Sequence, residues 1–191
     1  RVMLRVLANL AVPWDSVHVF QVDERVAPLG DPARNLTQLH ECLLAHAPLR
    51  PEQVHAMPVE QANLDAAARS YAALLCAIAG TPPVLDLVHL GLGVDGHTAS
   101  LVPGDPSLDV LDQEVALAGP YQGRRRMTLT FPVLDRARRV LWVVTGEEKS
   151  SMLRRLQSGD RTIPAGRVRQ ERALLIADRA AVLLPKNRCQ A

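Results

Sequence analysis

Short apolar runs alternate along the chain with longer segments of helical periodicity. Four runs are short, apolar and bounded by turn residues, namely Val17–Val22, Leu85–Leu90, Val140–Val144 and Leu174–Ile176. Such runs are typical of buried strands. From Leu64 to Ile78 the apolar residues instead recur at the spacing of a helix, with Asn63 placed to cap its start and Gly80 to end it.

Two further segments are predicted to be helical. Leu36, Leu39 and Leu43 keep the helical spacing, and Gly146–Leu156 has acidic residues in its first turn. Strands and helices therefore alternate along the chain. This order favours an α/β fold with a doubly wound, mostly parallel sheet, helices on both faces and a modified Rossmann-like topology. No repeat or linker interrupts the order, so we expect residues 1–191 to form a single domain.

The composition narrows the class of protein. Hydrophobic residues make up 48% and charged residues 22% of the chain, which is typical of a folded globular domain. No run approaches the roughly 18 consecutive apolar residues of a membrane helix, and no secretory signal pattern is present. The 3 cysteines are an odd number without metal-like spacing. We therefore expect a cytoplasmic protein with no membrane partner and no disulfide framework.

Arginine dominates the basic residues. All but two of the 22 basic side chains are arginines, which hold planar oxyanions in a fork of donors. A basic tract lies between Arg124 and Arg139, but aromatic residues make up only 3% of the chain, too few for a platform on which nucleic-acid bases stack. We expect no nucleic-acid partner. An arginine-rich nucleic-acid binder stays open as an alternative, and its affinity would fall steeply with salt.

The most informative motif follows the predicted strand Leu85–Leu90. Residues Gly91–Leu101 contain three glycines within six residues, which let backbone amides approach a ligand, and the residues after them can open a helix whose amino end favours anions. His97 brings an imidazole with an unperturbed pKa of ~6.5, suited to proton transfer near neutrality, and Asp95 lies two residues before it. His97 is therefore the candidate base. The alternative is a tight turn that needs glycine only for packing.

A second motif, Asp23-Glu24-Arg25, ends the predicted strand Val17–Val22 in three charges. Charge runs are usually solvated loops. These charges, however, fall at the carboxyl end of a buried strand, where α/β proteins build their sites. Asp23 and Arg25 are therefore expected to face one cleft.

Two further stretches each carry a candidate cation. In Arg126–Thr130 the strand-like alternation puts Arg126 on one face with two threonines, unless this is an edge strand that carries arginine for solubility. Lys149 follows the predicted strand Val140–Val144 in the turn before a helix. The alternative interpretation is that Lys149 is an ordinary exposed lysine of that helix.

Several common cofactor and hydrolase motifs do not occur in the sequence. Gly91 and Gly93 lack the third glycine of a dinucleotide site, and there is no Gly-x-x-x-x-Gly-Lys-Ser/Thr loop. The nucleophile elbow of serine hydrolases, Gly-x-Ser-x-Gly, is also missing. No pair of histidines has metal-ligand spacing. NAD, ATP and a bound metal are therefore disfavoured.

Taken together, the four stretches resemble the 6-phosphogluconolactonase branch of the glucosamine-6-phosphate isomerase/6-phosphogluconolactonase family. The likeness rests on the Asp-Glu-Arg signature with the later Asn35, the Gly-x-Gly-x-Asp-Gly-His-Thr-Ala-Ser-Leu signature, the Arg-x-Thr strand and the Gly-x-x-Lys turn, in family order. Glucosamine-6-phosphate deaminases, which share the fold, have Asp-Glu-Tyr and Asp-Gly-His-Ile-Ala-Phe-Asn instead. Arg25 and Thr98–Leu101 favour the lactonase branch.

The resemblance implies hydrolysis of 6-phospho-D-glucono-1,5-lactone to 6-phosphogluconate in the oxidative pentose phosphate pathway, with His97 taking a proton from the attacking water. The catalytic residues that it implies are His97, Asp95 and Arg25. The substrate-binding residues that it implies are Asp23, Asn35, Gly91, Gly93, Arg126 and Lys149, the last two as phosphate ligands. It also implies no metal, no organic cofactor and a small sugar-phosphate lactone as partner. We expect a monomer rather than an oligomer.

Two features of the sequence differ from the family. Its members begin with a strand and a Gly-Gly-Ser-x-Pro loop, whereas this chain begins with Arg1-Val2-Met3-Leu4, so we expect the domain to be amino-terminally incomplete. Arg34-Asn35-Leu36 stands where the family has Ser-Asn and an aromatic residue. Two alternatives stay open: a glucosamine-6-phosphate deaminase or isomerase, and a non-catalytic module that binds a sugar phosphate.

Overall fold

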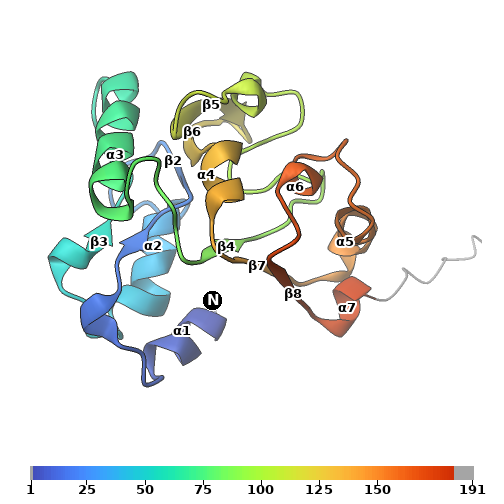
Figure 1. The fold of residues 1–191 in the computed structure, drawn as a ribbon, viewed down its shortest axis with the longest axis horizontal. Coiled ribbons are helices and arrows are strands. Elements are labelled where there is room, and N and C mark those ends of the chain that lie inside the picture. The colour runs from blue at the N-terminus through green and yellow to red at the C-terminus, as the bar shows by residue number, and fades with distance from the viewer. Residues whose placement is uncertain (1, 183–191) are drawn as a thin grey trace, which may run out of the picture.

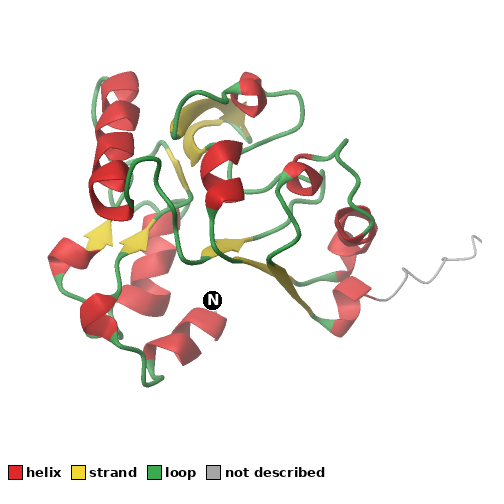
Figure 2. Ribbon diagram, in the orientation of Figure 1, coloured by secondary structure: helices red, strands yellow, loops and turns green. Residues whose placement is uncertain are grey.

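The structure, a computed structural model, describes residues 2–182, in which helices and strands alternate (Figure 2). The strands are β1 (Val19–Phe20), β2 (Asp23–Arg25), β3 (Val54–His55), β4 (Val88–Leu90), β5 (Val115–Tyr121), β6 (Arg124–Leu129), β7 (Val140–Val144) and β8 (Ala173–Ala177). The helices are α1 (Val2–Ala8), α2 (Asn35–Leu39), α3 (Leu64–Ala79), α4 (Phe131–Arg136), α5 (Ser150–Gln157), α6 (Pro164–Arg167) and α7 (Arg179–Val182). Short helical turns lie at Trp14–Ser16, His40–Leu44, Pro51–Gln53, Pro106–Asp109 and Glu147–Lys149.

The strands form three small sheets. β4, β7 and β8 form a parallel sheet in that order, which crosses the middle of the molecule in Figure 1. β1 and β3 form a parallel pair, and β2, β6 and β5 form an antiparallel sheet with β6 in its centre. The predicted α/β class and its parallel pairing are confirmed, whereas the described strands do not join into one continuous sheet.

The predicted strand Val17–Val22 is shorter in the structure. Only Val19–Phe20 forms a strand, β1, and β2 begins after the predicted range, at Asp23, in another sheet. The change of sheet occurs at Gln21, whose buried side chain accepts a hydrogen bond from the Met57 N–H (2.9 Å) and donates one to Glu24 (2.9 Å). These bonds hold the bend and lay β2 against β6.

The main core surrounds β4 and β7. Both strands bury alternate residues, and Trp142 of β7 is fully buried. The predicted burial of the strand Leu174–Ile176 is wrong, because Leu174 is 62% and Ile176 49% exposed. Leu174 and Ile176 lie on the same face of β8, because side chains alternate along a strand, and that face is the exposed one among the described residues.

The three predicted helices are all present. α3 begins after Asn63, whose side chain accepts a hydrogen bond from the Ala66 N–H (2.9 Å), and it ends at Gly80, which has a φ of 90°. The segment around Leu36–Leu43 forms α2 and the turn that continues it, and Gly146–Leu156 forms a helical turn followed by α5. Within the described residues, no helix is long and apolar enough to cross a membrane.

Candidate active site

One cavity of about 1040 Å³ collects nearly all of the predicted site residues. Those that line it are Asp23, Arg25, Asn35, Gly91, Gly93, His97, Arg126 and Lys149. They come from β2, the start of α2, the loop after β4, β6 and the turn after β7. The cavity therefore unites four stretches that are far apart in the sequence. Asp95 does not line the cavity but contacts His97, which does.

His97 and Asp95 form a directed pair. His97 Nδ1 lies 2.6 Å from Asp95 Oδ1, and the His97 backbone N–H donates to the same oxygen (3.2 Å). A carboxylate next to Nδ1 keeps the proton on that nitrogen, so Nε2 of the neutral ring is free to accept a proton. Burial raises the pKa of Asp95, but the hydrogen bonds from His97 and the charge of its ring outweigh burial, so the pKa lies below its usual value. Asp95 thus stays ionised as the partner of His97.

Glycine is required where the loop after β4 folds against itself. A Cβ at Gly93 would lie 2.1 Å from His97 Nδ1 and 2.6 Å from Asp95 Oδ1, so only glycine leaves room for the pair. Gly96 has a φ of +84°, and a Cβ there would lie 2.7 Å from Ile163 Cβ. The predicted helix after these glycines is wrong, because Gly91–Leu101 folds into successive turns. The glycines therefore allow side chains to pack closely against the backbone, and they do not begin a helix.

Asp23 is held by hydrogen bonds to both of its carboxylate oxygens. Asn35 Nδ2 donates to Oδ1 (3.0 Å) and Ser100 Oγ donates to Oδ2 (2.7 Å). Burial raises the pKa of Asp23, although Ser100 and the charges of Arg25 and Arg126 oppose the increase. Asn35 therefore positions Asp23, and Ser100, which our sequence analysis did not single out, ties the Gly91–Leu101 loop to β2.

Two arginines face each other across β2 and β6. Arg25 is the register partner of Arg126. Arg126 is only 4% exposed, and its Nε has no hydrogen-bond partner among residues 2–182. Burial and the charge of Arg25 lower the pKa of Arg126 below its ordinary value. Two guanidinium groups brought together in this way favour an anion between them, because its charge would relieve both the repulsion and the unsatisfied donor.

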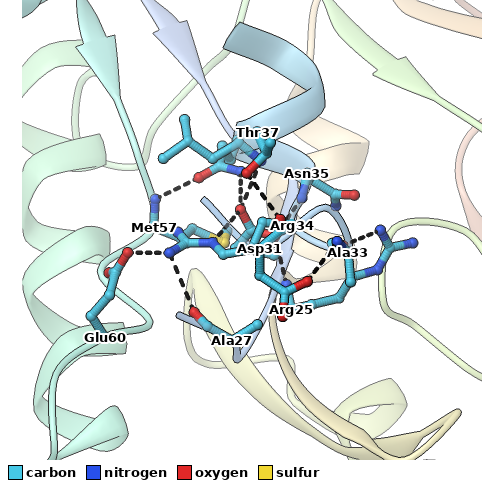
Figure 3. A network of polar contacts seen from close by, with 12 residues as sticks. Arg25, Ala27, Asp31, Ala33, Arg34, Asn35, Thr37, Met57 and Glu60 are labelled. Atoms are coloured by element: carbon cyan, nitrogen blue, oxygen red, sulfur yellow. Dashed lines mark hydrogen bonds and ion pairs between the residues drawn. The ribbon is translucent and has the colours of Figure 1, made fainter. Parts of the chain in front are cut away.

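Glu24 organises the loop that carries these side chains. Its buried carboxylate accepts hydrogen bonds from five donors: the backbone N–H groups of Arg25 (2.7 Å), Asn35 (2.7 Å) and Leu36 (2.8 Å), Gln21 Nε2 (2.9 Å) and Arg34 Nε (3.2 Å). Figure 3 shows the Arg34 guanidinium extending from this cluster to Glu60 and the Ala27 carbonyl. Arg34 and Glu24 are both fully buried. Glu24 thus connects the end of β2 to the start of α2.

Lys149 approaches the cavity from the neighbouring strand. It ends the helical turn Glu147–Lys149 after β7, and β7 is parallel to β4. The loops after two adjacent parallel strands leave the sheet at the same edge, so Lys149 and His97 line the same cavity there. Lys149 forms no ion pair within the described part of the chain.

Tyr121 at the end of β5 is a site residue that our sequence analysis missed. Its ring lies 5.1 Å from the His97 ring at an interplanar angle of 65°, and Arg126 Cζ lies 4.9 Å from its centroid. The base and the buried arginine are therefore separated by a single aromatic ring. In the described range, no three His, Cys, Asp or Glu side chains come together as a metal site.

The family follows from comparison of the whole chain with known proteins. The family model described as glucosamine-6-phosphate isomerases/6-phosphogluconolactonase matches residues 1–176. The chain belongs to this family. His97, Asp95 and Arg25, which carry the resemblance given in the sequence analysis, line or support the cavity.

Two curated relatives give the extent of the likeness. The chain is 37% identical over 198 residues to a 6-phosphogluconolactonase of Mycobacterium tuberculosis, covering 96% of this chain and 80% of that protein. It is 37% identical over 151 residues to a 6-phosphogluconolactonase of Synechocystis sp., covering 77% of this chain. The chain spans only 62% of the length of the Synechocystis relative.

A solved structure of the family has the same fold. The 6-phosphogluconolactonase of Thermotoga maritima superimposes with a TM-score of 0.81 at 28% sequence identity, over 91% of this chain and 78% of that one. The arrangement of helices and strands described above is therefore that of the family.

Proposed function

We propose that the protein hydrolyses 6-phosphogluconolactone to 6-phosphogluconate. The observation that carries the proposal is the location of the His97–Asp95 pair in one cavity with Arg25, Arg126 and Lys149. A proton acceptor and a cluster of cations suit a phosphorylated sugar whose ring ester is opened by water. The names of the relatives from Mycobacterium tuberculosis and Synechocystis support the same reaction.

In the proposed reaction His97 acts first as a base. Its Nε2 takes a proton from a water molecule as the water oxygen forms a bond to the lactone carbonyl carbon. The carbonyl oxygen becomes an oxyanion, which Arg25 stabilises as a charged donor. When the intermediate collapses, the bond between the carbonyl carbon and the ring oxygen breaks, and the imidazolium returns the proton to that oxygen. Asp95 holds the ring in the required tautomer and stabilises its positive form.

Arg126 and Lys149 are proposed to bind the phosphate. Arg126 is buried with one donor unsatisfied among the described residues, and a phosphate oxygen would supply the missing acceptor. Lys149 adds a second positive charge from the turn after β7. Anchoring the remote phosphate in this way places the lactone carbonyl against the base.

We further propose that the two parallel sheets belong to one doubly wound, mostly parallel sheet. β1 and β4 each lack a neighbour on one side among the described strands, and both line the same cavity. A crystal structure of the protein in which β1 and β4 stayed in separate sheets would contradict this proposal.

The proposed activity is tested directly with freshly prepared 6-phosphogluconolactone. We expect the purified protein to accelerate formation of 6-phosphogluconate above the spontaneous rate, measured by proton release and by enzymatic detection of the product. A parallel assay measures ammonia from glucosamine 6-phosphate. Acceleration of neither reaction, by protein shown to be folded by circular dichroism, would refute the proposal. Ammonia release without lactone hydrolysis would assign the chain to the deaminase branch.

Replacing Arg126 by alanine is expected to weaken substrate binding. We expect KM to rise roughly ten- to hundredfold, the value of hydrogen bonds to a charged group, with a smaller change in kcat. Arg126→Lys should recover part of the loss, because it restores the charge without the fork of donors. The matched control is Arg154→Ala, which removes the same charge from an exposed position on α5. Equal KM values for Arg126→Ala and the control would exclude Arg126 as a phosphate ligand.

A further inference from the structure

The turn between β5 and β6 determines where Tyr121 lies. Tyr121 pairs with Arg124, and the two residues between them have positive φ angles, 53° for Gln122 and 76° for Gly123. Such a two-residue turn matches the twist of antiparallel strands and closes a tight hairpin. The hairpin lies at the top of the molecule in Figure 1, where β6 also pairs with β2. Tyr121 is therefore held at the end of a strand next to the site.

A β-bulge just before Tyr121 changes the direction of its side chain. The register passes from Ala118 opposite Arg126 to Tyr121 opposite Arg124, so β5 has one more residue than β6 in this interval. The backbone N–H of Gly119 instead donates to Asp105 Oδ2 (2.8 Å). Bulges re-aim side chains and are common beside active sites. Asp105 thus stabilises the irregularity that directs Tyr121.

The side chain of Tyr121 contacts two members of the candidate site and lies near a third. Its ring packs edge-on against His97, and the Arg126 guanidinium lies over its face in a cation–π contact. Burial and the negative charge of the nearby Asp95 raise the pKa of Tyr121, and Arg126 opposes them. Asp95, which contacts His97 directly, is therefore also near Tyr121.

We propose that Tyr121 is a positioning residue that aligns Asp95, His97 and Arg126 for the hydrolysis proposed above, on which this inference rests. The hydroxyl fixes the Asp95 carboxylate and through it the orientation of the imidazole. The ring limits the movement of His97 and supports the buried guanidinium. The hydroxyl therefore contributes to kcat. The ring contributes in addition to substrate binding, because it supports Arg126.

The first test measures the Tyr121–Asp95 interaction without any assay of activity. The chain has 2 tyrosines, so the tyrosinate absorbance lost on Tyr121→Phe reports Tyr121 alone. We expect Asp95→Asn to lower the pH at which Tyr121 ionises, because it removes a negative charge that opposes ionisation. The control is Asp135→Asn, at a helix outside this site, which should leave the titration unchanged. Equal midpoints in Asp95→Asn and the parent would overturn the proposal.

The second test separates the hydroxyl from the ring. Tyr121→Phe should lower kcat roughly tenfold with little change in KM, the effect of one hydrogen bond to a charged group. Tyr121→Ala should lower kcat at least as much and also raise KM, because Arg126 loses the ring beneath it. Arg125→Ala, an exposed change in the same hairpin, controls for disturbance of β6. Parent-like kcat and KM in both tyrosine variants would overturn the role. If the parent protein does not hydrolyse the lactone, the proposed function fails. The titration of Tyr121 in Asp95→Asn then still tests whether Tyr121 interacts with Asp95.

Discussion

Replacement of His97 by alanine is expected to lower kcat by about 10²- to 10⁴-fold, the usual contribution of a positioned base. KM should change little, because His97 is proposed to act on water and on the ring oxygen and not to hold the phosphate. The loss follows from the removal of Nε2, the proton acceptor that the Nδ1–Asp95 contact leaves available. Steady-state kinetics against the spontaneous hydrolysis rate measure both parameters.

The control for this experiment is His40→Ala, which removes an exposed imidazole from the turn after α2. The kcat of Asp95→Asn should lie between the kcat values of this control and of His97→Ala, because the variant keeps the base but removes the charge that orients it. A kcat for His97→Ala within a few-fold of the parent would remove His97 from the mechanism.

The second large effect concerns stability. Glu24→Gln is expected to lower the free energy of unfolding by about 3 to 5 kcal/mol, the range for removing one partner of a buried ion pair. The change leaves the fully buried Arg34 without its fully buried partner, with only the partly exposed Glu60 still paired to it, and weakens the acceptor for three backbone N–H groups. Urea unfolding followed by circular dichroism measures the loss. Glu52→Gln, in an exposed pair with Arg50, should cost well under 1 kcal/mol.

A double variant distinguishes the ion pair from the backbone contacts of Glu24. If the loss comes from a buried guanidinium that keeps only the partly exposed Glu60 as its ion-pair partner, Glu24→Gln combined with Arg34→Met should be more stable than Glu24→Gln alone, because the buried charge is removed. If the double variant loses the sum of the two single effects, the backbone contacts of Glu24 dominate instead. An unchanged free energy of unfolding in Glu24→Gln would show that the network contributes nothing to stability.

The elements that the sequence predicts best are those whose pattern is local. β7 has the predicted bounds, and α3 begins after the predicted cap, because Asn63 and the apolar spacing act within a few residues. The predicted strand Val17–Val22 is shortened to Val19–Phe20, and Gln21, directly after it, accepts a long-range hydrogen bond from Met57. No local pattern carries that information.

The same distinction applies to the candidate site. His97, Arg25 and Lys149 were predicted because they follow strands, and the ends of strands gather at sheet edges. Tyr121 was missed because its approach to His97 depends on a bulge and on the register of β5 against β6. The role of Glu24 was missed for a related reason, because the donors to its carboxylate include the backbone N–H groups of Asn35 and Leu36, which only the folded loop brings to it.

The pairing of β2 with β6 determines the side of the sheet to which the Arg25 and Arg126 side chains project. Arg25 and Arg126 stand opposite each other, and neighbouring residues of a strand project to opposite sides. Deleting one residue from the Gln122–Gly123 turn would force a slip that carries Arg126 to the other side, where it would meet solvent or apolar neighbours. The ability to attract an anion is thus encoded in the length of a two-residue connection as firmly as in the arginines themselves.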